Sequence, residues 1–254
     1  MAVSDATQRF SSRVSDYVRY RPSYPSQVVD LLKSECGLTR DSVLADIAFG
    51  TGIFTQLLLE NGNHVYGVEP NREMRQAGED FLASYSHFKS VSGTAEATTL
   101  PDSSIDIATC AQAAHWFDLA NARKEFGRIL KPGGWAVLLW NERRVDSTPF
   151  LREYEQLVLT FGSDYKEVRH ERTTEIIHQF FDPTAFKLHT FEMFQQCDYA
   201  RLEGRLLSSS YVPQAGSPNY SLMIAELHRI FDAHQVNGLV TLEYNTLVYY
   251  AQLA

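Results

Sequence analysis

Hydrophobic residues over 43–140 occur in short runs that alternate with segments of helical periodicity. Five runs predict strands, near 43–47, 64–68, 88–91, 105–110 and 135–140. Three segments between them predict helices, near 52–61, 71–83 and 119–130. A turn is expected at "KPGG", residues 131–134. Strands that alternate with helices in this way favour a parallel sheet with right-handed crossovers.

The pattern differs on both sides of this region. Upstream, Pro25 is suited to open a helix that Gly37 ends. Downstream of Asn141, the segments with helical or strand character are 150–181, 198–208 and 217–234 for helices, and 185–194 and 239–253 for strands. We expect the two late strands at a sheet edge, joined by extra helices. Ligands of open α/β sheets bind outside the carboxyl ends of the strands, so this insertion is expected to cover the ligand face.

The stretch "VLADIAFGTGIFTQLLLENG", residues 43–62, predicts a strand, a glycine turn and a helix. Gly50 and Gly52 allow a close approach of the backbone to a ligand, and the start of the helix presents free N–H groups. A dinucleotide fingerprint requires a third glycine where Thr55 stands, so a nicotinamide or flavin cofactor is disfavoured. A P-loop is excluded, because no Gly-Lys-Ser/Thr follows the turn.

Two acidic residues stand at the ends of the first two predicted strands. Asp46 ends the first strand just before the turn, and Glu69 ends the second. A carboxylate at the second position can accept two hydrogen bonds from ribose hydroxyls. A glycine turn combined with a strand-end acid therefore indicates a nucleoside-containing cofactor.

Five motifs occur in an order and spacing that resemble a known family. They are "DIAFGTG", "GVEPNREM", "GTAEATTLP", "SIDIATCAQAAHWFD" and "ILKPGGWAVLLWN". Together they resemble the class I S-adenosylmethionine-dependent methyltransferases of the type 11 group. "RPSYP" and "HWFD" further resemble relatives of trans-aconitate methyltransferase. The resemblance covers residues 10–141 and implies a Rossmann-like α/β fold: a seven-stranded, mostly parallel, doubly wound sheet with an antiparallel last strand and a helical insertion or lid.

The resemblance also implies an organisation of the chain and a cofactor. We expect a single methyltransferase domain over 1–254. Its parts would be an N-terminal lid and first helix (1–37), a cofactor-binding core (38–141), a helical insertion and edge strand forming a substrate cap (142–238) and a last strand (239–254). The cofactor would be S-adenosyl-L-methionine, with S-adenosyl-L-homocysteine as product and no metal.

Cofactor contacts are implied residue by residue at positions matching the family's motifs. They are Asp46, Ala48, Gly50, Gly52, Glu69, Pro70, Asn71, Thr94, Ala95, Gln112 and Ala113. Ala48 replaces the family's usual first glycine, and Thr94 stands where an aspartate is often found. Glu69 would hold the ribose hydroxyls, while Gln112 would lie beside the methionine portion.

The resemblance implies catalytic or substrate-side roles for His115, Trp116 and Arg21. His115 and Trp116 would lie near the sulfonium and the acceptor, although a structural histidine and a core tryptophan explain them equally well. Arg21 could pair with a carboxylate, and Tyr17, Tyr20 and Tyr24 could wall the site.

Methyl transfer is an in-line displacement, in which alignment and desolvation are the protein's main tasks. A hydroxyl, amine or carbon acceptor would need a base, for which His115 is the best placed. A carboxylate acceptor needs a cation instead, and the four arginines considered are Arg21, Arg143, Arg144 and Arg205. Residues 204–213, "GRLLSSSYVP", could surround a polar substrate, or could simply end a helix.

Composition narrows the partners. Lys plus Arg is 23 and Asp plus Glu is 31, giving a net charge of −8 with no basic block, which disfavours nucleic acid. Cys36, Cys110 and Cys197 have no metal-binding spacing and suggest a reduced, cytoplasmic protein. No signal-like or membrane-length apolar run is present in this sequence. We expect a small-molecule substrate, no membrane, and a monomer or homodimer.

Three alternatives stay open at this stage. One is a protein or RNA methyltransferase, although "AQAAHW" stands where an Asn/Asp-Pro-Pro-Tyr signature for amino-group methylation would lie. Another is a non-catalytic S-adenosylmethionine-binding protein, which the departures at Ala48 and Thr94 allow. The third is a dinucleotide oxidoreductase, which Thr55 disfavours. For a small-molecule enzyme, a carboxylic acid is one acceptor class.

Overall fold

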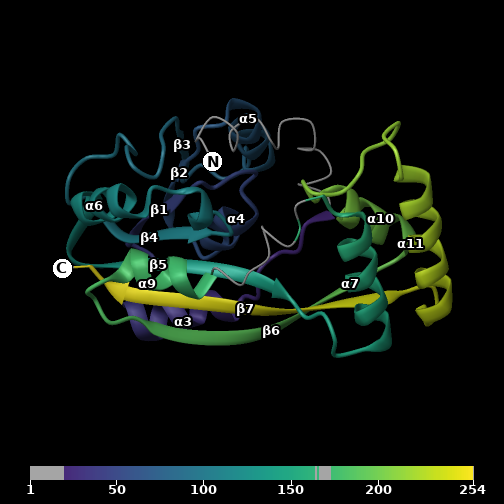
Figure 1. Cartoon of the computed structure of the whole chain (residues 1–254). Coiled ribbons are helices and arrows are strands. Elements are labelled where there is room, and N and C mark those ends of the chain that lie inside the picture. The colour runs from purple at the N-terminus through teal and green to yellow at the C-terminus, as the bar shows by residue number, and fades with distance from the viewer. Residues whose placement is uncertain (1–19, 164, 166–172, 254) are drawn as a thin grey trace.

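The computed structural model describes residues 20–163, 165 and 173–253, and its centre is one sheet (Figure 1). The strands are β1 (Val43–Ile47), β2 (His64–Val68), β3 (Phe88–Val91), β4 (Ile105–Ala111), β5 (Leu130–Arg143), β6 (Lys187–Cys197) and β7 (Val240–Gln252). They follow the order β3-β2-β1-β4-β5-β7-β6. Strands β1 to β5 are parallel, and β7 runs antiparallel to both β5 and β6. The predicted sheet with its antiparallel last strand is confirmed.

The helices lie where the sequence predicts them, except for a short 3₁₀ helix after β4 that was not predicted. They are α3 (Gln27–Cys36), α4 (Ile53–Glu60), α5 (Arg72–Phe81), the short 3₁₀ helix η2 (Ala114–Trp116), α6 (Leu119–Ile129), α7 (Pro149–Phe161), α9 (Thr173–Phe181), α10 (Tyr199–Leu207) and α11 (Tyr220–His234). Residues 1–19, which hold Tyr17 and much of the expected lid, lie outside the described residues. The same is true of 164 and 166–172 within the helical region predicted at 150–181.

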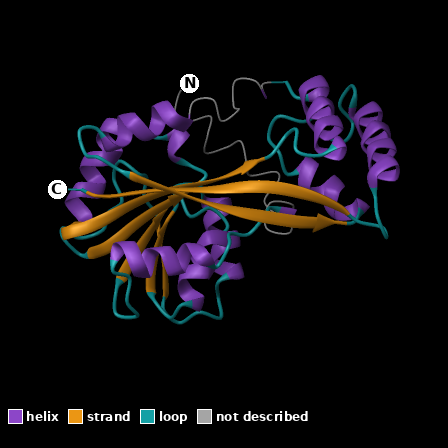
Figure 2. Cartoon of the chain, turned by 90° about the horizontal axis from the view of Figure 1, so that it is seen from below, coloured by secondary structure: helices purple, strands orange, loops and turns teal. Residues whose placement is uncertain are grey.

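Helices cover both faces of the sheet, as Figure 2 shows. On one face, Phe126 of α6 and Phe180 of α9 pack with Trp140 of β5 in one buried cluster. On the other face, Leu32 of α3 and Leu58 of α4 belong to a second buried cluster. The parallel strands are therefore buried on both sides, which explains their nearly continuous apolar runs.

A third buried cluster forms beyond the carboxyl ends of the parallel strands. Helices α7, α10 and α11 pack there around Leu151, Leu206 and Leu227, together with the ends of β6 and β7 (Figure 1). We call this part, residues 149–163 and 198–244, the cap. Strand β7 has 13 residues, so it extends from the cap into the core sheet. The long strands thus hold the cap beside the carboxyl edge, where ligands of such sheets bind.

The prediction that "KPGG" forms a turn before the strand is wrong. Residues 131–134 belong to β5, which begins already at Leu130. Strand β4 pairs Ile105 with Leu130 but Ile107 with Trp135, so two steps on β4 face five on β5. Gly133, with φ 79°, absorbs this bulge. Its carbonyl accepts a hydrogen bond from Gln252 Nε2 at 3.1 Å. The local signal is that of a turn, but pairing on both sides continues the strand.

All three cysteines are free and buried. Among the described residues, no helix has both the length and the apolar character needed to cross a membrane.

Candidate active site

The glycine turn after β1 adopts a left-handed backbone at three positions. Ala48, Gly50 and Gly52 have φ values of 57°, 59° and 86°. At Gly52 a Cβ atom would lie 2.7 Å from Leu82 Cδ1, so only glycine meets both the φ and the space. Ala48 has no such exemption, and a non-glycine residue there stores about 1–2 kcal/mol of strain. Such strain is typical of a site where the backbone is shaped for a ligand.

Asp46 lies under this turn and not at its surface. Its carboxylate accepts the hydroxyl hydrogens of Thr55 at 2.6 Å and Thr109 at 2.9 Å, and the residue is 1% exposed. Burial raises the pKa of Asp46 to about 7. Thr55, which stands in place of the third fingerprint glycine, therefore anchors β1 to the start of α4. The cofactor contact predicted for Asp46 stays a prediction.

Glu69 ends β2 beside the turn with both carboxylate oxygens fixed. Oε2 accepts the N–H of Gly50 at 3.0 Å, and Oε1 accepts the N–H of Asn71 at 2.9 Å. Asn71 in turn caps α5 by accepting the N–H of Met74 at 2.8 Å. Burial raises the pKa of Glu69, whose side chain nevertheless keeps lone pairs for two further donors. Pro70, next to it, is exposed.

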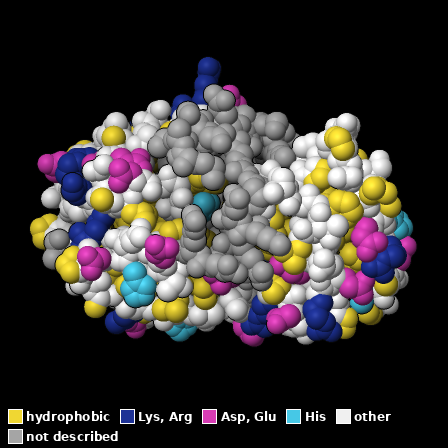
Figure 3. Space-filling view, in the orientation of Figure 1, with side chains coloured by type: hydrophobic (Ala, Val, Ile, Leu, Met, Phe, Trp, Pro, Cys, Tyr) yellow, Lys and Arg dark blue, Asp and Glu magenta, His cyan; other side chains and the backbone are white. Residues whose placement is uncertain are grey.

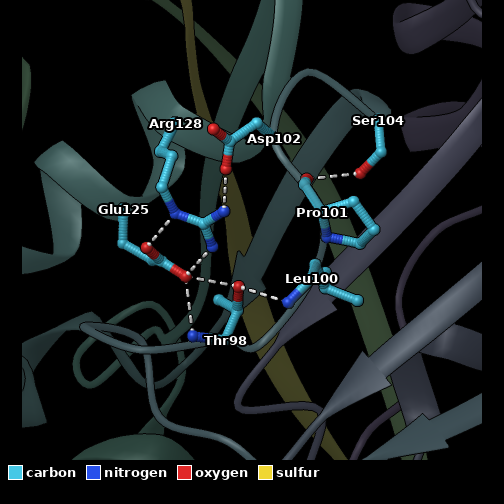
Figure 4. Close-up of polar contacts among 7 residues, drawn as sticks. All are labelled: Thr98, Leu100, Pro101, Asp102, Ser104, Glu125 and Arg128. Atoms are coloured by element: carbon cyan, nitrogen blue, oxygen red, sulfur yellow. Dashed lines mark hydrogen bonds and ion pairs between the residues drawn. The ribbon is translucent and has the colours of Figure 1, made fainter.

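The segment with Thr94 and Ala95 forms a tight antiparallel bridge. Thr94 N–H donates to the Ala97 carbonyl at 3.1 Å, and Ala95 is buried in the core. The following residue Thr98 donates from N and Oγ1 to Glu125 Oε1, at 2.7 and 2.5 Å. Figure 4 shows that Arg128 joins Glu125 to Asp102. This network fixes the loop after β3 to α6.

The segment after β4 turns sharply toward β5. Gln112 has φ 61° and donates from Nε2 to the Asn141 carbonyl at 3.2 Å. Ala113 precedes η2, which carries His115 and Trp116 with ring centroids 4.7 Å apart. His115 is exposed and Trp116 is partly buried.

A cleft with about 560 Å³ of open volume joins the turn to the cap. Its lining comprises Arg21, Pro22, Tyr24, Ala48, Phe49, Gly50, Thr51, Ile53, Phe54, Ala111, Gln112, Asn141, Arg205 and Tyr244. The core side contributes the turn and Gln112, and the cap side contributes Arg205 and Tyr244.

The cleft contains only some of the predicted site residues. It brings together Arg21, Ala48, Gly50 and Gln112. The remaining predictions lie outside its lining: Asp46, Gly52, Glu69, Pro70, Asn71, Thr94, Ala95, Ala113, His115 and Trp116. Glu69 still reaches the turn through Gly50, as described above. The other roles stay predictions.

Two cleft residues, Asn141 and Tyr244, were missed from the sequence. Asn141 accepts the hydroxyl hydrogen of Thr246 at 2.6 Å and donates to the Ser23 carbonyl at 3.0 Å, tying the N-terminal segment to the sheet. Tyr244 pairs with Arg143 in the β5–β7 register. Strand alternation alone marks the buried positions of β7 and does not show which ones face a ligand.

Four arginines were candidates for positioning a carboxylate, and the structure separates them. Arg144 is joined to Glu192 and lies 3.7 Å from Glu243, outside the cleft lining. Arg21 donates from Nη2 to the Ser208 carbonyl at 3.0 Å and lines the cleft.

Arg143 and Arg205 are both buried but differ in their partners. Arg143 is paired with Glu155, and its guanidinium lies 4.9 Å from the ring centroid of Tyr154. Arg205 donates from Nε to Tyr244 Oη at 3.3 Å and from Nη1 to Ser209 Oγ at 3.2 Å. Tyr244 Oη donates onward to Gln195 Oε1 at 3.3 Å. No ion pair to Arg205 is present among the described residues.

Arg205 is a buried charge without a counter-ion among the described residues, and burying a charge costs several kcal/mol per ion. Its hydrogen bonds to the hydroxyl groups of Tyr244 and Ser209 and the negative end of α10 offset this cost but leave the net charge in place. The site therefore favours an anion in the cleft. The serines of the segment 204–213 contribute to this wall through Ser208 and Ser209, while Tyr211 packs on Tyr165 with ring centroids 4.9 Å apart.

The described residues contain no cluster of possible metal ligands. Within 20–163, 165 and 173–253, no three His, Cys, Asp or Glu side chains are grouped so that they could hold a metal ion.

Comparison with known proteins shows a similarity to methyltransferases. Residues 45–138 match a family model described as a methyltransferase domain. An uncharacterized methyltransferase of Mycobacterium tuberculosis is 36% identical over 169 residues, which are 66% of this chain and 65% of that protein. An uncharacterized methyltransferase-like protein of Schizosaccharomyces pombe is 30% identical over 65% of this chain and 63% of its own. The matches thus span just under two thirds of these relatives.

Solved structures agree on the fold. A candidate type II methyltransferase from Anaeromyxobacter dehalogenans superposes with a TM-score of 0.66 at 21% identity, covering 92% of this chain and 98% of that one. The [4+2]-cyclase SpnF superposes with a TM-score of 0.60 at 14% identity, covering 99% and 97%. Residues 45–138 thus match a methyltransferase domain, and the chain shares the fold of the solved methyltransferase structures.

The residues present fit the cofactor that this family uses. Gly52 packs against Leu82 so closely that a Cβ atom would not fit, which fixes the path of the turn. The turn has a left-handed backbone at Ala48 and Gly50, and both residues line the cleft. Glu69 presents a carboxylate at the strand end, oriented by two backbone N–H groups. These are the groups a nucleoside with a short polar tail requires.

Proposed function

We propose that this protein transfers a methyl group from S-adenosyl-L-methionine to a small-molecule acceptor, with a carboxylic acid as the favoured class. The single observation that carries the proposal is the cleft itself. It joins the strained turn at Ala48 and Gly50 on the core side to Arg205 and Tyr244 on the cap side. A donor and an acceptor could therefore lie against opposite walls.

S-adenosylmethionine, when bound, supplies a sulfonium-linked methyl group that an acceptor lone pair can displace in line. Glu69 would accept the ribose hydroxyls, and the turn at 48–52 would pack against the methionine part. The side chain of Gln112 is oriented by its hydrogen bond to the Asn141 carbonyl, so it could lie against the methionine part of the cofactor. Thr94, Ala95, Pro70 and Asn71 would border the adenine.

The acceptor determines whether a base is needed. A carboxylate is already ionised near neutral pH and needs only to be positioned and desolvated. The buried guanidinium of Arg205 and the half-buried Arg21 are the cleft groups suited to this task. A hydroxyl or amine acceptor would need His115, which is exposed and outside the cleft lining. The arrangement therefore favours an acceptor that needs no base.

The surface supports a small acceptor over RNA. On the face seen in Figure 3, basic and acidic side chains of the described residues are interspersed, without a continuous basic patch. The net charge is −8. Phosphate binding on RNA needs a basic footprint. We extend the proposal to a cytoplasmic protein that is a monomer or a homodimer. Gel filtration with light scattering would test the oligomeric state.

A second function deserves the same test because the fold also serves other chemistry. SpnF, which shares the fold, is named a [4+2]-cyclase. A chain that binds the cofactor without transferring its methyl group is the corresponding alternative.

Turnover separates the two. The protein would be incubated with S-adenosylmethionine and a panel of small mono-, di- and tricarboxylic acids, and formation of S-adenosylhomocysteine would be measured. Acceptor-dependent formation supports the proposal. Cofactor binding without turnover on carboxylic acids, alcohols or amines would contradict it.

A further inference from the structure

The two buried arginines beside the cleft form a natural comparison. Arg143 and Arg205 both lie in the region where the cap meets the sheet, and both are at most about a tenth exposed. Arg143 has Glu155 as its counter-ion. Arg205 has only neutral partners among the described residues, the hydroxyl groups of Tyr244 and Ser209. One guanidinium is therefore compensated within the protein and the other is not.

The groups that face Arg205 do not supply the missing negative charge. Burial raises the pKa of Tyr154, so this phenol stays neutral at physiological pH. Gln195 is a neutral amide that accepts from Tyr244. The remaining charged group on the same cleft, Arg21, is also a cation. The cleft lining thus carries an excess of positive charge.

The hydrogen bonds of Arg205 leave one side of the guanidinium for a ligand. Nε and Nη1 donate to protein groups, which fixes the plane of the fork. Nη2 donates to no described residue, and Arg205 lines the cleft. With Nε and one N–H of Nη1 engaged, the second N–H of Nη1 and an N–H of Nη2 remain as two parallel donors, which suit a carboxylate without a further loss of side-chain entropy.

The position of Arg205 decides between two sources of carboxylate. The cofactor of this family carries one on its methionine part, and the acceptor could carry another. The turn at 48–52 lies on the core wall, whereas Arg205 and Tyr244 belong to α10 and β7 of the cap. If the cofactor lies against the turn, the cap side of the cleft is left for the acceptor.

We propose that Arg205, held by Tyr244 and Ser209, is the residue that selects the acceptor by binding its carboxylate. This inference rests on the proposed function, since it assigns the acceptor side of the same cleft. In this proposal Arg205 binds the acceptor and favours acceptors that carry a carboxylate. Arg143 has Glu155 as its counter-ion and lies outside the cleft lining.

The test measures anion binding to the protein saturated with S-adenosylhomocysteine. Succinate, citrate and inorganic phosphate would be titrated calorimetrically, with uncharged succinamide as control. We expect saturable binding of the two carboxylates and none of succinamide. Binding of phosphate alone, or no binding of any carboxylate, would overturn the inference. Failure of S-adenosylhomocysteine itself to bind would instead contradict the proposed function.

Variants then locate the binding group. R205Q is expected to weaken carboxylate binding at least tenfold and leave S-adenosylhomocysteine affinity within about twofold, and R205K should recover part of the loss. R201Q is the matched control, because Arg201 lies exposed one turn earlier on α10 and should behave as wild type. A tenfold loss of S-adenosylhomocysteine affinity in R205Q would assign Arg205 to the cofactor and overturn the inference.

A second variant guards against misfolding of R205Q. Y244F keeps the ring but removes the hydroxyl that links Arg205 to Gln195. It should weaken carboxylate binding several-fold without affecting the cofactor. If R205Q does not fold, Y244F alone decides. An unchanged carboxylate affinity in Y244F would then count against the assignment, because the hydrogen bond from Arg205 to Tyr244 would have no effect on binding.

Discussion

Thr55 donates its hydroxyl hydrogen to the buried carboxylate of Asp46 across 2.6 Å, directly beneath the glycine turn. This bond gives a physical reason for the departure from a dinucleotide fingerprint. A glycine at 55 would let α4 approach β1 more closely but would leave Asp46 with Thr109 as its other side-chain donor. The hydroxyl instead fixes the strand, the turn and the helix to one another.

Replacement of Thr55 tests this relationship. Thr55→Val keeps the shape and removes the donor, so we expect a loss of about 1–3 kcal/mol in unfolding free energy, the cost of an unsatisfied buried acceptor. Affinity for S-adenosylhomocysteine should fall as well, because the turn loses its anchor. Urea denaturation and calorimetry measure the two effects. Thr55→Ser retains the hydroxyl and serves as the control; equal stability of the Val and Ser variants would refute the role.

Ala48 tests the strain in the turn. Its φ of 57° disfavours any side chain, and a β-branched one most. Ala48→Gly removes the strain but adds freedom to the unfolded chain, so we expect stability to change by less than about 1 kcal/mol. Ala48→Val should destabilise by about 2 kcal/mol or more. Thermal unfolding of both variants measures this, and a Val variant as stable as wild type would contradict the observed backbone conformation.

Glu125 predicts a dependence of stability on acid. Hydrogen bonding from Arg128, together with Thr98, lowers the pKa of Glu125 to about 2 from its ordinary value of 4.5 (Figure 4). Because the folded-state pKa is lowered, its stabilisation is fully present above pH 4.5 and is lost as the pH falls through about 2. The increment should be about 1–3 kcal/mol.

Denaturant titrations of wild type and Glu125→Gln between pH 7 and pH 2 measure it. The difference between the two proteins should shrink toward pH 2. Glu175→Gln, at an exposed carboxylate of α9, is the matched control, and its difference from wild type should stay small over the same range. A difference between wild type and Glu125→Gln that stays constant over the whole range would show that the ion pair does not carry the stability.

Much of the fold could be predicted because its signals are local. The apolar runs mark the strands, and the turn follows from Gly50 and Gly52. Glu69 was predictable because it ends a strand. The continuation of β5 through Gly133 was not, since strand pairing with β4 and the bond from Gln252 override the local turn signal.

The cap wall of the cleft depends on tertiary packing. Arg205 and Tyr244 lie 39 residues apart, and nothing in either segment indicates that they meet. The sequence marks Arg205 only as one of four candidate arginines. The absence of a counter-ion, which sets it apart from Arg143, appears only when the two arginines are compared in space. The predicted roles of His115 and Trp116 stay predictions.

The most direct test of the central claim is a calorimetric titration of the protein with S-adenosylhomocysteine, with NAD as control. We predict saturable binding of S-adenosylhomocysteine and none of NAD. Glu69→Ala should weaken the binding at least tenfold, because the ribose hydroxyls lose their acceptor and Gly50 and Asn71 lose theirs. Binding of NAD, or an affinity for S-adenosylhomocysteine that is unchanged in Glu69→Ala, would contradict the assignment of the site.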